Sequence, residues 1–104
     1  MEDRRIFDRV PVEFSLRFLN LWETKEGNAV TTDISAKGVG ILAEEDVPSH
    51  TALEIWFKVP GRNEPLYTRG EVAWCRESGD SKYRVGINLE KAYFMGFSKF
   101  LTVT

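Results

Sequence analysis

The chain has 104 residues, which is the size of one domain and enough to bury a single modest core. Its content of 42% hydrophobic and 12% aromatic residues is typical of a globular protein and argues against disorder. The formal net charge of −2 provides no general positive field for long nucleic acid or an acidic membrane, so an anion site would need local arginines. The single cysteine, Cys75, excludes an intramolecular disulfide and a cysteine-based zinc cluster.

Residues 1–9 are charged and lack strand alternation, so we expect a flexible arm. No signal peptide or membrane span follows it, and we expect a cytoplasmic protein without membrane insertion.

Period-two alternation dominates the next eighty residues and predicts short β-strands. Clusters of glycine, proline, asparagine, serine and aspartate separate the alternating stretches and are typical of turns. Six such strands with short connections indicate an all-β fold, either a compact barrel or a sandwich. The apolar positions are Val12, Phe14, Leu16 and Phe18; Val30, Thr32 and Ile34; Val39 and Ile41; Leu53, Ile55, Phe57 and Val59; Val72 and Trp74; and Tyr83, Val85, Ile87 and Leu89.

Residues 91–101 place Phe94, Phe97 and Leu101 at spacings of three and four, which predicts a short C-terminal α-helix with one apolar face. Gly96 weakens that helix by about 1 kcal/mol relative to alanine, so the helix must pack on the rest of the fold. We therefore divide the single domain into an arm (1–9), a β-domain (10–90), and a helix with its tail (91–104).

Residues suited to catalysis are sparse. The one histidine, His50, lies in a turn without an acid or nucleophile near it in sequence, and Cys75 lies in a strand pattern typical of a buried small side chain. The glycines at 38 and 40 form a bare G-x-G without the rest of a dinucleotide-binding fingerprint. We expect no enzyme, no catalytic residue and no metal site.

Three arginines, Arg4, Arg5 and Arg9, lie in the N-terminal arm. A guanidinium is a planar fork of donors that matches phosphate oxygens and the O6/N7 edge of guanine. The alternative is a solvated, charged terminus, because three acidic residues leave the arm locally neutral.

A second group of polar residues lies at positions 33–38. If the apolar residues before it face the core, Asp33 and Ser35 share the outer face, roughly 6.6 Å apart along the strand. A carboxylate can accept from the N1–H and N2–H₂ edge of guanine, a serine hydroxyl can donate to phosphate or base, and Gly38 would let a flat ring approach the backbone. The alternative is an ordinary aspartate or serine turn.

The two groups together form an ordered pair of motifs, R-x-x-x-R from Arg5 to Arg9 and D-x-S-x-x-G over residues 33–38. This pair resembles the PilZ domain family, whose members are bacterial receptors for cyclic di-GMP. The resemblance covers nearly the whole chain, since residues 70–76 and 83–89 are similar to the family's late strands.

The resemblance implies a six-stranded antiparallel β-barrel with a C-terminal helix and an arm that closes over the ligand. It further implies that Arg5 and Arg9 contact guanine edges and phosphates, while Asp33 and Ser35 bind a guanine from the barrel wall. Gly38 would allow the ligand close to the backbone.

The resemblance adds three more candidate ligand-binding residues. Trp74 is similar to an aromatic residue that stacks on guanine in some members, although its alternation with Val72 leaves a core position open. Lys37 is a secondary candidate for ligand binding. Arg4 precedes the first motif, as in members that bind two mutually intercalated cyclic di-GMP molecules, so we expect two ligands per chain and no other cofactor.

The expected function is therefore that of a receptor that signals by arm closure to an unidentified downstream protein. Two alternatives stay open. Small barrels with outer arginines and tryptophans also bind single-stranded nucleic acid, which the net charge of −2 and the lack of a basic stripe disfavour. The chain could also be an interaction module without a ligand.

Overall fold

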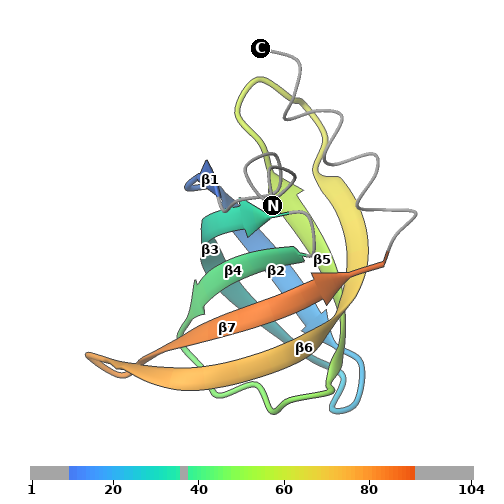
Figure 1. Ribbon diagram of the computed structural model, residues 1–104. Helices are drawn as coiled ribbons and strands as arrows, with labels where there is room; N and C mark the ends of the chain where they lie inside the picture. The colour runs from blue at the N-terminus through green and yellow to red at the C-terminus, as the bar shows by residue number, and fades with distance from the viewer. Residues whose placement is uncertain (1–9, 36–37, 91–104) are drawn as a thin grey trace, which may run out of the picture.

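The computed structural model describes residues 10–35 and 38–90. These residues form seven β-strands, and every pairing between them is antiparallel (Figure 1). The strands are β1 (Val10–Pro11), β2 (Ser15–Asn20), β3 (Lys25–Ser35), β4 (Gly38–Ala43), β5 (Ala52–Lys58), β6 (Leu66–Gly79) and β7 (Lys82–Leu89).

Six of these strands close into a barrel. The order is β3-β2-β5-β6-β7-β4, and β4 pairs with β3 to complete the ring, while the short β1 adds to β3 (Figure 1). The all-β fold and the six-stranded antiparallel barrel are therefore confirmed. The predicted flexible arm and C-terminal helix lie outside the described residues. The part of the chain that the structure describes contains no helix long and apolar enough to cross a membrane.

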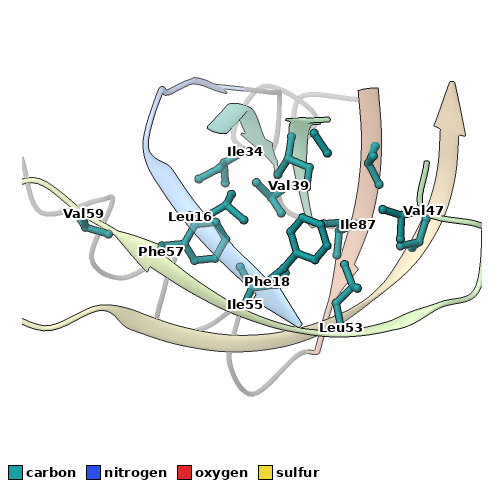
Figure 2. Close-up of a cluster of buried hydrophobic side chains, with 14 residues drawn as sticks. Leu16, Phe18, Ile34, Val39, Val47, Leu53, Ile55, Phe57, Val59 and Ile87 are labelled. Atoms are coloured by element: carbon teal, nitrogen blue, oxygen red, sulfur yellow. The ribbon is translucent and has the colours of Figure 1, made fainter. Parts of the chain in front are cut away.

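Buried apolar side chains fill the barrel, and Figure 2 shows Leu16, Phe18 and Ile55 gathered with others between the strands. Leu53, Ile55 and Phe57 of β5 are fully buried, as the alternation predicts. Val47, from the connection between β4 and β5, packs into the same core. The interior is therefore occupied by side chains.

β1 and β2 both pair with the same edge of β3, and residues 12–14 separate the two strands. Thr31, which is only 2% exposed, joins the two strands across this interruption. Its Oγ1 accepts a hydrogen bond from the Phe14 N–H at 2.8 Å and donates one to the Val12 carbonyl at 2.8 Å. The Thr31 N–H donates to the Phe14 carbonyl at 2.8 Å as well. This side chain thus fixes residues 12–14, between β1 and β2, to β3.

A bulge in β3 corrects one prediction. The register between β3 and β4 shifts between Thr31 and Asp33, and the buried residues are Thr31 and Ile34, the latter 3% exposed. The prediction that Val30, Thr32 and Ile34 share one core-facing side is wrong. The extra residue of the bulge breaks the alternation, so that inward-facing positions before and after the bulge are no longer an even number of residues apart. Asp33 remains on the outer side, between the bulge and the buried Ile34.

A second bulge lies in β6, between Val72 and Trp74. Val72 is 0% exposed and belongs to the core. Ala73 is the additional residue, so Val72 and Trp74 lie on opposite faces, and the next residue, Cys75, packs against the core. Trp74 therefore faces outward, which answers the question that the alternation left open.

Candidate functional site

A row of four paired residues crosses the outer wall of the barrel. Asp33 of β3 pairs with Gly40 of β4, Gly40 pairs with Gly86 of β7, and Gly86 pairs with Trp74 of β6. With about 4.8 Å between neighbouring strands, the Asp33 and Trp74 backbones are about 14 Å apart. Two positions without side chains thus separate a carboxylate from an indole.

The side chains at both ends of the row lie over these glycines. A Cβ built on Gly40 would be 2.8 Å from Asp33 Oδ1 and 2.9 Å from Thr32 Oγ1. A Cβ built on Gly86 would collide with the Trp74 indole, whose Cζ2 would be 2.7 Å away. Both glycines are needed because the neighbouring side chains occupy the space above them. We call the surface between Asp33 and Trp74 the glycine shelf.

Two arginines lie beside the glycine shelf. Arg76 of β6 pairs directly with Arg84 of β7, two residues along each strand from Trp74 and Gly86. The Arg76 guanidinium carbon is 5.1 Å from the centroid of the Trp74 ring, a cation–π distance. Together these groups border a groove of about 440 Å³. Its lining residues are Asp33, Gly40, Trp74, Arg76, Glu77, Ser78 and Arg84.

The next row of the same wall contains Ser35 and Gly38. Ser35 pairs with Gly38, and Gly38 pairs with Asn88 of β7. A Cβ on Gly38 would overlap the Ile87 carbonyl oxygen, so β7 is the backbone that approaches this glycine closely. The fold itself therefore requires Gly38, and the approach of a ligand to it stays a prediction.

The remaining candidates, Arg4, Arg5, Arg9 and Lys37, lie outside the described residues. What the structure does give is the attachment point of the arm. Val10, which follows Arg9 in sequence, is paired with Ile34, the neighbour of Asp33. The described backbone thus joins the arm to the strand that carries Asp33.

Sequence reasoning missed Arg76 and Arg84 as well as the two glycines of the shelf. The signal was present in part, because Arg76 follows Trp74 by two residues and must share its face in an extended strand. The pairing of Arg76 with Arg84 could not be found this way, since it depends on the register between β6 and β7.

The single thiol is unsuited to nucleophilic work. Burial raises the pKa of Cys75, a backbone hydrogen bond from Val47 lowers it in part, and the Asp46 carboxylate raises it again. The thiol donates to Asp46 Oδ1 at 3.3 Å and stays protonated at neutral pH.

His50 Nδ1 lies 3.1 Å from Glu71 Oε2 on the exposed surface. Among the residues that the structure covers, no cluster of histidine, cysteine and carboxylate side chains could hold a metal ion.

Comparison with known proteins gives the wider context. The Bacillus subtilis inhibitor of motility (MotI/DgrA) has a similar structure, with a TM-score of 0.63 and 12% sequence identity. The match covers 97% of this chain and 54% of that one, so the chain spans about half of that protein's length. At this identity the likeness shows the shared fold. No curated protein matches the sequence. The PilZ domain matches residues 3–92, which is most of the 104 residues, and the chain therefore belongs to the PilZ domain family.

Proposed function

We propose that this chain is a receptor for cyclic di-GMP, the messenger of the PilZ domain family, and that it acts by changing its protein contacts rather than by catalysis. The observation that carries the proposal is the glycine shelf between Asp33 and Trp74. A guanine lying there would stack on the indole and direct its N1–H and N2–H₂ edge towards the carboxylate. Base stacking on an aromatic side chain contributes about 1–3 kcal/mol.

The arm supplies the cations in this proposal. Arg5 and Arg9 bind phosphates and guanine edges, and residues 1–9 close over the ligand. Ser35 assists from the next row of the wall, and Lys37 is a secondary contact. The pairing of Val10 with Ile34 supports this arrangement, because it joins the arm to the strand that carries Asp33 and Ser35.

The stoichiometry is proposed as two ligands per chain. A stacked pair of cyclic di-GMP molecules has four phosphate charges, and Arg4 adds a guanidinium that can neutralise the pair and stack on it. Titration at protein concentrations well above the dissociation constant measures the endpoint. We expect two ligands for the wild type and a shift towards one for Arg4→Leu. A wild-type endpoint of one would exclude the pair and leave the receptor proposal intact.

The output is proposed to be a surface presented to another protein in the cytoplasm. The structural neighbour is named as an inhibitor of motility, which supports a regulatory role for this fold. Arm closure would change the surface near β1 and β3, where the arm joins the barrel.

Calorimetry tests the receptor proposal. We expect Asp33→Ala to weaken cyclic di-GMP binding by about 1–3 kcal/mol, since a charged acceptor for the guanine edge is removed. Binding of cyclic di-AMP should not weaken, because adenine lacks the N1–H and N2–H₂ donors. Glu64→Ala, which removes an exposed carboxylate from the β5–β6 connection, is the matched control and should bind as wild type. A chain that binds a single-stranded oligonucleotide and not cyclic di-GMP would refute the proposal.

A further inference from the structure

Arg76 and Arg84 face each other across β6 and β7 on the outer wall. Like charges at directly opposite positions of an antiparallel pair repel and destabilise the sheet. An anion between or beside the two guanidinium groups would relieve this repulsion.

Asp33 and Glu77 line the same groove, but no carboxylate of the described part lies within 4 Å of either guanidinium. Several other cations of the barrel do have a carboxylate within 4 Å: Arg17 lies 3.5 Å from Glu26, Lys25 lies 3.4 Å from Glu45, and Lys82 lies 3.5 Å from Glu44. Within residues 10–35 and 38–90, neither Arg76 nor Arg84 forms an ion pair of this kind. Two cationic side chains thus lie at opposite positions on the border of the groove, without an ion-pair partner among the described residues.

Arg76 also occupies the place where a base would stack. One side of the Trp74 ring rests on Gly86, and the Arg76 guanidinium lies 5.1 Å from the ring centroid. Since the glycine closes one face, the guanidinium competes with a base for the exposed part of the ring. A base can stack fully on Trp74 only if Arg76 moves.

We infer that Arg76 and Arg84 together bind a phosphodiester of the ligand, an arrangement that we call the clamp. When a base stacks on Trp74, the Arg76 guanidinium leaves the indole ring and binds this phosphate instead. The inference rests on the proposed function, because it places the ligand in the same groove. Arginine suits the exchange, since its fork of donors matches phosphate oxygens. Arg84 lies two residues from Gly86 along β7, roughly 6.8 Å, a distance that its long side chain can span towards the glycine shelf.

The binding test compares Arg76→Gln and Arg84→Gln with Arg17→Gln. Arg17 is the matched control because its guanidinium lies 4.4 Å from the Trp56 ring, an arginine over a tryptophan that does not line this groove. Measured by calorimetry at several salt concentrations, each groove variant should bind cyclic di-GMP about 10- to 100-fold more weakly. Because salt screens the attraction between a guanidinium and a phosphate, log K should depend less steeply on log salt in each groove variant than in the wild type. Arg17→Gln should match the wild type in both measurements.

A measurement without ligand tests the exchange separately. Trp22→Phe and Trp56→Phe leave Trp74 as the one tryptophan of the chain. Adding Arg76→Gln should increase acrylamide quenching of Trp74, whereas Arg84→Gln should leave quenching unchanged. Equal quenching with and without Arg76 would overturn the exchange.

The experiments distinguish a failure of the clamp proposal from a failure of the receptor proposal. Wild-type affinity and salt slope in both groove variants would overturn the clamp and leave the receptor standing. A wild-type chain that binds no cyclic di-GMP would instead overturn the receptor and the clamp with it.

Discussion

Replacing Thr31 by valine should destabilise the barrel through the two hydrogen bonds of one hydroxyl. Thr31 Oγ1 accepts from the Phe14 N–H and donates to the Val12 carbonyl, each at 2.8 Å. Valine keeps nearly the same volume but leaves both backbone groups without this partner. An unsatisfied buried group costs about 1–3 kcal/mol. Phe14 and Val12 are half-buried and can be partly rehydrated, so we expect a total loss of about 2–3 kcal/mol.

Thr68→Val is the matched control, since Thr68 is 0% exposed and its Oγ1 has no hydrogen-bond partner in the described part of the chain. Removing that hydroxyl should leave stability unchanged or raise it by about 1 kcal/mol, because an unsatisfied polar atom disappears. Urea unfolding followed by tryptophan fluorescence gives both free energies of unfolding. For a domain of this size the destabilisation by Thr31→Val corresponds to a melting temperature lower by about 10–20 °C. Equal losses in the two variants would refute the reasoning.

Two further predictions concern the wall and the thiol. Gly40→Ala should lower cyclic di-GMP affinity about tenfold in calorimetry, since its Cβ would lie 2.8 Å from Asp33 Oδ1 and would displace the carboxylate; wild-type affinity would show that this carboxylate position is unimportant. Cys75 has a raised pKa in the folded chain, so its contribution to stability is full below the ordinary thiol pKa and is lost as the pH rises through the raised value. Urea unfolding across alkaline pH should show this loss in the wild type and a smaller one in Cys75→Ala, and identical profiles would contradict it.

Much of the barrel could be predicted from the alternation of apolar residues. Leu16 and Phe18, or Leu53 and Ile55, show period two because one side of each strand is buried. The same pattern could not distinguish barrel from sandwich, since closure depends on the pairing of β3 with β4 and of β2 with β5. These pairings join different strands, and the local pattern of apolar residues contains no information about them.

The bulges explain what local reasoning missed in the site. The alternation places Trp74 with Val72, but the extra residue Ala73 turns the indole outward. The extra residue in β3 likewise moves the buried position to Thr31. A bulge adds one residue without changing composition, so neither was visible in the sequence. Motif resemblance proposed Asp33 as a site residue, whereas the groove that Asp33 lines depends on the strand register.

The wall that carries the glycine shelf is also a junction between two halves of the chain. Strands β2 to β4 form one meander, with β1 added to β3, and β5 to β7 form another; residues 44–51 are the covalent link between them. Asp33 and Gly40 belong to the first half, Gly86 and Trp74 to the second, so the shelf exists only after β4 has paired with β7. A ligand bound across this junction, as proposed above, would hold the halves together and stabilise the closed barrel by mass action. Fragments cut within residues 48–50 would therefore regain the groove only on reassociation, and the barrel offers a natural division for a two-part biosensor.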